Sequence, residues 1–299
     1  MEVTRAYLRL GNGEQQEDQV KLTERVEAGV HALFIDGLSD QALDSEFGAG
    51  IALRVEGMKR WMADHRHSEY WCRPEFGTDF TFVPDETQGL IYEKADGSFG
   101  VVLPVVSEQY KCVLTGCGED TVLAKLFSWY GNMTACKALA VVWAEGEDPY
   151  ALLEQCARVG LRLLGTGVRT RQQRRYPELF EYLGWCSWDA FEIRVDEDSL
   201  LAKCQEFRDK GIPVKWAILD DMWAEVRDFY GRAYSSRPEM FRLMHSSRLY
   251  SFQADPIRFP NGLKACIEKI NGSVPTAEGL PHPDGERHLH PQPRAGQGL

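Results

Sequence analysis

Two short segments of the sequence place carboxylates beside tryptophans at the ends of apolar runs. The first, residues 183–191, reads Leu-Gly-Trp-Cys-Ser-Trp-Asp-Ala-Phe and contains Asp189. The second, residues 216–223, reads Trp-Ala-Ile-Leu-Asp-Asp-Met-Trp. A predicted helix lies between the two runs, and such a crossover joins parallel neighbouring strands. Acids at the carboxyl ends of parallel strands lie where a β/α barrel binds its substrate, so the sequence predicts the beginning of such a barrel.

The acid pair Asp220 and Asp221 suits ligand binding better than bond cleavage. Neighbours in a strand point to opposite faces, whereas retaining glycoside hydrolysis needs two carboxylates about 5 Å apart across the substrate. At a strand end, where the backbone turns, both carboxylates can accept hydrogen bonds from vicinal hydroxyls of one sugar. Trp185, Trp188 and Trp223 are candidates to stack on the apolar face of a pyranose ring. The pattern predicts a sugar-binding site.

Other interpretations of the same residues stay open. Trp185 and Trp216 could be barrel core, and Asp189 could only cap a helix or loop. The acid pair is harder to explain structurally, because two acids have little reason to end a buried strand. Cys186 and Ser187 lie beside an acid, but no histidine is near them in the sequence, which disfavours a nucleophilic triad.

The composition describes an acidic chain with enough apolar residues for two cores. It has 299 residues, 43% of them hydrophobic, and a formal net charge of −11 at pH 7. Negative charge argues against nucleic acid or an anionic membrane as partner. No stretch approaches the roughly 20 apolar residues of a membrane helix, and no secretory signal follows Met1. We expect a soluble protein that handles a neutral small molecule without a cofactor, in an oligomeric state that the sequence leaves open.

The cysteines and histidines form no metal-binding pattern. Eight cysteines are scattered without a C-x-x-C pair, several of them in apolar segments where Cys behaves as a small hydrophobe. His282, His288 and His290 could bind a metal, but they lie in a stretch that reads as an unstructured tail. These patterns predict a reduced, cytoplasmic chain without a metal site.

Residues 1–145 predict an antiparallel β-sandwich domain. Short apolar runs alternate with turn signals there, and no helical pattern separates them. Asp96 and Gly97 lie between two such runs and are typical of a hairpin turn. Residues 122–128 fit a helix or a strand equally well.

The rest of the chain predicts a linker, a barrel fragment and a tail. Residues 146–175 form a helical linker, with Asp148 as N-cap and Pro149 at the first helical position. Residues 176–271 hold two predicted strands, a helix between them, a long irregular stretch over about 224–259 and a last helix. They are the first β/α units of an incomplete TIM barrel. Residues 272–299 are rich in Pro and Gly, lack Phe, Trp and Tyr, and are predicted to be disordered.

In these segments the chain resembles glycoside hydrolase family 36, specifically its raffinose synthase and seed imbibition protein branch of α-galactosidase-like enzymes. The W-C-S-W-D-A-F string of residues 185–191 and the D-D-x-W string of residues 220–223 carry the resemblance together. Further matching blocks keep the family order along the chain: residues 70–77, 84–88, 102–106, 146–150, 211–213 and 251–264.

The resemblance implies an N-terminal β-sandwich followed by a (β/α)8 barrel. It also implies a retaining mechanism on α-galactosides, by a hydrolase or a galactosyltransferase, so the expected partner is an α-galactoside sugar. In this family the acid pair binds the galactose hydroxyls at C4 and C6, a role that falls here to Asp220 and Asp221. Trp185, Trp188 and Asp189 would be neighbouring site residues.

The resemblance also implies two catalytic carboxylates that have no counterpart in this sequence. In the family the aspartate nucleophile lies at barrel strand four and the acid/base near strand six. Binding groups alone do little for bond cleavage, so we expect sugar-positioning residues but no meaningful α-galactosidase activity. The change of composition near Gly272 resembles a frameshift or a truncated gene model. The alternatives are an inactive remnant that at most binds galactose or serves as a structural module, and a non-glycosidase barrel enzyme.

Overall fold

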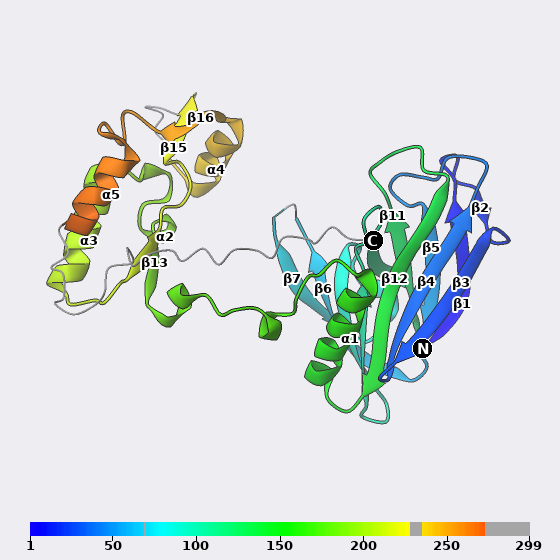
Figure 1. Cartoon of the computed structure of the whole chain (residues 1–299). Helices are drawn as coiled ribbons and strands as arrows, with labels where there is room; N and C mark the ends of the chain where they lie inside the picture. Colours follow the sequence, from blue (N-terminus) through cyan, green and yellow to red (C-terminus); the bar gives the residue numbers. More distant parts are fainter. Residues whose placement is uncertain (69, 228–234, 273–299) are drawn as a thin grey trace, which may run out of the picture. The chain divides into compact units, whose positions relative to one another are not determined.

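The computed structural model describes residues 1–68, 70–227 and 235–272. The chain divides into two units, which are described one at a time (Figure 1). Unit 1 is Met1–Arg175 and unit 2 begins at Tyr176.

Unit 1 is a β-rich body with one long helix. Its strands and helix are β1 (Glu2–Arg9), β2 (Gln15–Gln16), β3 (Val20–Glu27), β4 (Val30–Leu38), β5 (Ala49–Arg54), β6 (Met58–Arg66), β7 (Cys72–Gly77), β8 (Thr87–Lys94), β9 (Phe99–Pro104), β10 (Lys111–Gly118), β11 (Thr121–Phe127), β12 (Ala135–Gly146) and α1 (Pro149–Leu164). The segment over residues 122–128, which fitted a helix or a strand, is strand β11.

The strands of unit 1 form one antiparallel sheet with two arms. One arm runs β2-β1-β5-β11-β10, and the other runs β7-β6-β8-β9-β12-β4-β3. A single pair of facing residues, Leu114 on β10 and Thr87 on β8, joins the arms. The arms also approach at β4, where Gly37 lies against the Leu8 side chain of β1. The predicted antiparallel sheet is confirmed, curled into a nearly closed, barrel-like form.

Both arms of the sheet contribute to one buried core. Leu8 and Ile51 come from one arm and Ile35 and Leu90 from the other, and each is at most 2% exposed. Strands that alternate inward apolar with outward polar residues bury one face, so folding the sheet over itself removes that face from water.

Helix α1 packs on the outer face of the second arm. Asp148 accepts hydrogen bonds from the backbone N–H groups of the first turn, and Gly165, with φ of 65°, ends the helix. Leu152, Cys156 and Val159 are buried against side chains of β4, β9 and β12. The predicted linker over residues 146–175 therefore begins with a helix that belongs to unit 1.

Unit 2 combines short strands with helices (Figure 1). Its elements are β13 (Gly184–Cys186), α2 (Trp188–Phe191), α3 (Glu197–Asp209), β14 (Trp216–Ile218), β15 (Ala224–Arg227), α4 (Arg237–Ser246), β16 (Arg248–Ala254) and α5 (Gly262–Gly272).

A parallel pair of strands organises the first half of unit 2. β13 and β14 pair in parallel, with Trp185 opposite Ala217, and α3 connects them. The Asp196 side chain accepts a hydrogen bond from the backbone N–H of Ser199 and so begins α3 as predicted. Helices α3 and α5 share an apolar cluster that includes Leu200 and Cys266.

The prediction of an irregular stretch over about residues 224–259 is wrong in part. β15 and β16 pair there in antiparallel fashion, and α4 lies between them. The predicted tail, residues 272–299, lies outside the described residues except for Gly272, which ends α5.

Candidate functional site

Backbone pairing brings the two sequence motifs together at the carboxyl ends of β13 and β14. Ser187 follows β13, and its N–H donates to the carbonyl of Ile218 at 3.0 Å. The Oγ of Ser187 accepts a hydrogen bond from the N–H of Asp220, also at 3.0 Å. Ser187 is buried and held by this backbone bond, which gives it a structural role at the strand ends.

After β14 and Leu219, the acid pair and Met222 form a tight turn, which we call the acid turn. The N–H of Asp221 donates to Oδ1 of Asp220 at 2.7 Å, and the N–H of Met222 donates to Oδ1 of Asp221 at the same distance. Met222 has a φ of 70°, in the left-handed region that a side chain rarely adopts. The carboxylates therefore lie on a bend and not along an extended strand, as the sequence predicted.

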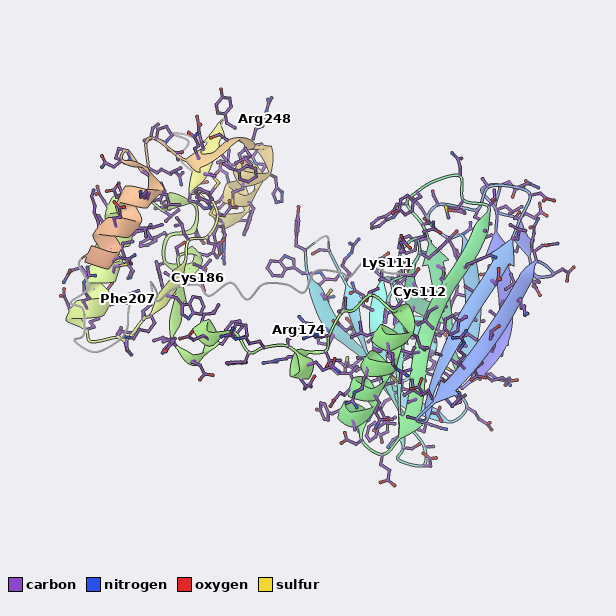
Figure 2. All side chains as sticks on the ribbon, in the orientation of Figure 1. Lys111, Cys112, Arg174, Cys186, Phe207 and Arg248 are labelled. Carbon is purple, nitrogen blue, oxygen red and sulfur yellow. The ribbon has the colours of Figure 1, made fainter. Side chains whose placement is uncertain are left out.

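Each acid keeps acceptor capacity for a ligand. A carboxylate oxygen has two lone pairs, and each Oδ1 uses one for the turn. Oδ2 of Asp220 lies 3.1 Å from Sγ of Cys186 on β13, which is labelled in Figure 2. Oδ2 of Asp221 has no hydrogen-bond partner among the described residues. Asp221 is exposed and Asp220 is half-buried, so both can be reached from solvent.

The neighbouring carboxylate changes the acidity of Cys186. A backbone hydrogen bond from Trp188 lowers the pKa of this thiol, but a hydrogen bond to Asp220, together with burial and the charges of Asp220 and Asp189, outweighs it, and the pKa is raised. The thiol is therefore held in its protonated form, as a donor to the acid pair.

The predicted tryptophans differ in their surroundings. Trp185 packs edge-on against Phe191 and Phe207, with ring centroids 5.9 and 5.5 Å apart, which favours a packing role. Trp188 and Trp223 are half-buried beside apolar clusters. Their stacking on a sugar stays a prediction.

Trp216 is half-buried and is held by packing and hydrogen bonds, but it belongs to no buried core cluster of the described residues. Its Nε1 donates to the carbonyl of Leu179 at 2.7 Å and to that of Tyr182 at 3.2 Å. Its ring lies so close to Gly184 that a Cβ there would meet Cζ2 at 2.1 Å. The glycine in the first motif therefore makes room for the tryptophan of the second.

Asp189 is exposed in the first turn of α2, and the N-cap position is Ser187. The Asp189 side chain accepts no hydrogen bond from the described residues, so the structure gives it no capping partner. Its charge contributes to the raised pKa of the Cys186 thiol.

Arg258, which contacts the acid turn through its guanidinium, was not predicted from the sequence. Its guanidinium donates to the carbonyl of Met222 at 3.2 Å. Backbone carbonyls have no sequence signature, so nothing in the motif pointed to this contact. The available signal was a basic residue inside the matching block of residues 251–264.

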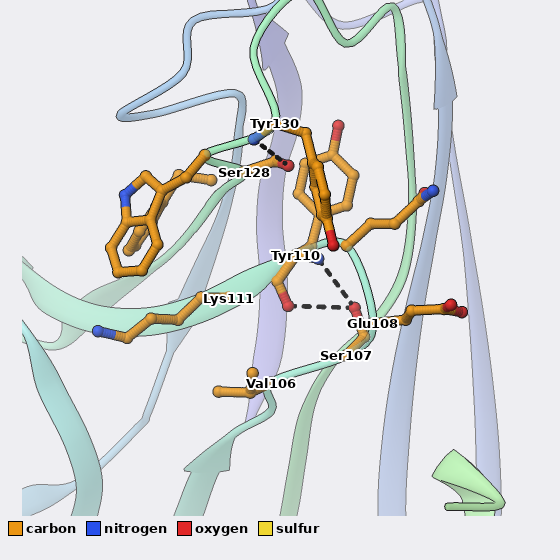
Figure 3. A pocket seen from close by; sticks show the side chains of 10 residues that line it. Val106, Ser107, Glu108, Tyr110, Lys111, Ser128 and Tyr130 are labelled. Atoms are coloured by element: carbon orange, nitrogen blue, oxygen red, sulfur yellow. Dashed lines mark hydrogen bonds between the residues drawn. The ribbon is translucent and has the colours of Figure 1, made fainter.

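A hollow in unit 1 and a groove in unit 2 lie outside the acid pair. A hollow of about 330 Å³ in unit 1 is lined by residues that include Glu108, Lys111, Trp129 and Tyr130 (Figure 3). We call it the unit 1 hollow. The α3–α5 groove of unit 2, about 420 Å³, runs between β14, α3 and α5 and is lined mainly by apolar side chains. Neither was anticipated from the sequence.

Within the described residues, no helix has the length and apolar character needed to cross a bilayer. The same part of the chain contains no group of three or more His, Cys, Asp or Glu side chains that could hold a metal ion.

A family model described as raffinose synthase or seed imbibition protein Sip1 matches residues 17–253, most of the chain. The chain belongs to this family. Every predicted site residue falls inside the matched range, and Arg258 lies five residues beyond it.

Curated relatives in the raffinose synthase family are longer than this chain. The chain is 27% identical over 278 residues to probable galactinol–sucrose galactosyltransferase 6 of Arabidopsis thaliana, with 84% of this chain and 36% of that protein covered. It is 23% identical to galactinol–sucrose galactosyltransferase of Oryza sativa subsp. japonica, with 73% and 30% covered. The chain therefore spans about one third of the length of these relatives.

Solved structures show the fold that this raffinose synthase-family chain shares. The GH36 α-galactosidase AgaA of Geobacillus stearothermophilus matches with a TM-score of 0.50 and 12% identity, over 91% of this chain and 45% of that chain. The galactosidase domain of the α-galactosidase–sucrose kinase AgaSK matches with a TM-score of 0.50 and 11% identity, over 90% and 44%.

Proposed function

We propose that this chain is part of an enzyme that acts on α-galactosides, a retaining hydrolase or a galactosyltransferase, and that unit 2 supplies its galactosyl-binding turn. Asp220 and Asp221 accept hydrogen bonds from the galactose hydroxyls at C4 and C6. The side chains of Trp188, Trp223 and Asp189 line the same sugar-binding site. Unit 1 would be the β-sandwich domain and β13–α3–β14 the first units of a (β/α)8 barrel.

The acid turn is the observation that supports this proposal most directly. Two adjacent carboxylates lie at the carboxyl end of a parallel strand, one exposed and one half-buried, with acceptor atoms left over after the turn bonds are made. Asp220 is held by Ser187 and Cys186 from the neighbouring strand. Anchored acceptors of this kind suit the hydroxyls of a neutral sugar, since they need little ordering on binding.

The catalytic nucleophile and acid/base are proposed to lie outside this chain, in parts of the family fold that it does not match. No meaningful turnover of an aryl α-galactoside is expected, because positioning groups alone provide little transition-state stabilisation. Turnover that Asp220→Ala abolishes would overturn this statement. A cytoplasmic location is also proposed, supported by eight cysteines that are all free.

Calorimetric titration with methyl α-galactoside tests the binding proposal. Methyl α-glucoside differs only at C4 and is the matched ligand. Asp220→Asn and Asp221→Asn should each weaken galactoside binding about tenfold or more, since a hydrogen bond to a charged group contributes about 1.5–3 kcal/mol. Asp209→Asn, which removes an exposed carboxylate from the last turn of α3, is the control and should leave affinity unchanged.

The second candidate function is that of a structural module without a sugar site, and an absence of sugar binding supports it. Its supporting observation is the α3–α5 groove, an exposed apolar surface beside β14 of the kind that marks interaction sites. Under that alternative, neither sugar binds and all three variants behave like the parent chain.

A further inference from the structure

Arg258 ties together three loops at the carboxyl ends of the strands in unit 2. Its side chain is 14% exposed. Nη1 donates to the carbonyl of Ile193, to that of Met222 at 3.2 Å and to that of Val195 at 3.5 Å. The first and last of these belong to the segment after β13, and Met222 belongs to the segment after β14. A single guanidinium therefore bridges the segments that follow β13 and β14.

The segment that carries Arg258 is itself fixed to the same loops. Asp255 is fully buried, and its N–H donates to the carbonyl of Trp223 at 2.9 Å. Its Oδ1 accepts hydrogen bonds from the N–H groups of Ile257 and Arg258 at 2.9 and 3.1 Å. The carbonyl of Arg258 accepts a hydrogen bond from the N–H of Glu197 at 3.0 Å. The backbone that carries the guanidinium is therefore held in place by these hydrogen bonds.

The charge of Arg258 is balanced by nearby carboxylates. Oδ2 of Asp255 is buried without a hydrogen-bond partner and lies 3.9 Å from Nε of Arg258. Burial lowers the pKa of the guanidinium, and the charges of Asp255, Asp196 and Asp221 oppose this. These three acids stabilise the buried cation, because a charge taken out of water needs partners.

We propose that Arg258 is a positioning residue for the acid pair. By holding the carbonyl of Met222, it keeps that residue in its left-handed conformation, and this conformation sets the direction of the Asp221 carboxylate. Non-glycine residues persist at positive φ only when their surroundings impose it, and Arg258 provides that constraint. The inference rests on the proposed function only in taking the acid pair to bind a sugar.

Arginine suits this role better than lysine would. The three carbonyls share the two N–H groups of Nη1, and the planar guanidinium holds these N–H groups in fixed directions. A lysine ammonium keeps the charge and has three N–H donors, but it ends a flexible chain that does not fix their directions. The two side chains therefore separate the effect of charge from that of geometry.

Arg258→Met and Arg258→Lys in the full chain test the proposal, with Lys264→Met as control. The Lys264 side chain is 91% exposed on α5, so its variant removes a positive charge from unit 2 without touching the turn. The first readout is amide hydrogen exchange at Asp221 and Met222, compared with amides in α3 and α5. The second is affinity for methyl α-galactoside.

The proposal expects Arg258→Met to speed exchange at Asp221 and Met222 at least tenfold, with α3 and α5 unchanged, and to weaken galactoside binding at least tenfold. Arg258→Lys should recover part of both effects, and Lys264→Met should change neither. The proposal would be overturned if Arg258→Met accelerated amide exchange equally throughout unit 2, or if it left exchange at Asp221 and Met222 unchanged. If the parent chain binds no galactoside, the proposed function fails, and the exchange comparison alone decides whether Arg258 holds the turn.

Discussion

Sγ of Cys186 lies 3.1 Å from Oδ2 of Asp220, so a thiol from β13 contacts the first carboxylate after β14. The two residues are 34 positions apart in the sequence. Their contact exists only because the strands pair in parallel with Cys186 opposite Ile218. A cysteine here donates to the carboxylate without bringing a second negative charge, because its pKa is raised.

Asp220→Asn should make Cys186 more reactive. The Asp220 carboxylate contributes to the raised pKa of the thiol, so a neutral amide lowers that pKa. More thiolate is then present at neutral pH, and the alkylation profile shifts toward lower pH. The rate of alkylation by iodoacetamide, followed at Cys186 by peptide mass spectrometry over neutral and alkaline pH, measures this.

Cys72 provides the internal reference for that experiment. It is exposed on β7 of unit 1 and should react at the same rate in both proteins. An unchanged or upward-shifted profile at Cys186 would show that Asp220 does not control the thiol.

Gly184→Ala should destabilise unit 2. The added Cβ would lie 2.1 Å from Cζ2 of Trp216, whose Nε1 is held by two carbonyls and cannot move aside freely. Overpacking of this kind costs about 1–3 kcal/mol. Urea denaturation, with the amides of unit 2 as probes, measures the change in free energy of unfolding.

Gly272→Ala is the matched control, because a Cβ there meets no atom within 4 Å. It should leave stability within about 0.5 kcal/mol of the parent. Equal effects of the two substitutions would contradict the close packing of Gly184 against Trp216.

The aromatic residues of the unit 1 hollow should not contribute to galactoside binding. Trp129 and Tyr130 are 77% and 72% exposed there, and exposed aromatic rings beside polar groups are an alternative surface on which a sugar could stack. Trp129→Ala and Tyr130→Ala should change stability by less than about 0.5 kcal/mol and leave the affinity for methyl α-galactoside unchanged. A loss of binding in calorimetry would place the sugar in unit 1.

The α3–α5 groove should bind a dye that fluoresces on apolar surfaces. Ile267 lines the groove and is 46% exposed. Ile267→Asn should lower the fluorescence of bound anilinonaphthalene sulfonate, since it places an amide on an apolar surface. Ile257→Asn is the control, because Ile257 is 71% exposed and does not line the groove. An equal decrease in both variants would mean that the dye binds elsewhere.

The sequence predicted those parts of the fold that local signals specify. Asp148 and Pro149 marked the start of α1, and Asp196 marked the start of α3. Asp96 and Gly97 form the predicted turn between β8 and β9, with Gly97 at a φ of 87°. The bend at Asp220 and Asp221 was expected because two acids end an apolar strand.

The parts that the sequence did not predict depend on distant partners. β16 exposes most of its residues and so has no apolar alternation that would identify it as a strand. Its pairing with β15 is long-range. Arg258 bonds to backbone carbonyls, and the close approach of Trp216 to Gly184 depends on tertiary register. Periodicity and capping rules do not report such contacts.

The central claim is that the acid turn of unit 2 recognises the galactosyl group, and residue-resolved NMR titration tests it most directly. Methyl α-galactoside should shift the amide signals of residues 186–189 and 220–223, methyl α-glucoside should not, and Asp220→Asn should abolish the response. Shifts that are the same for both sugars, that survive Asp220→Asn, or that fall at Trp129 and Tyr130 would contradict it.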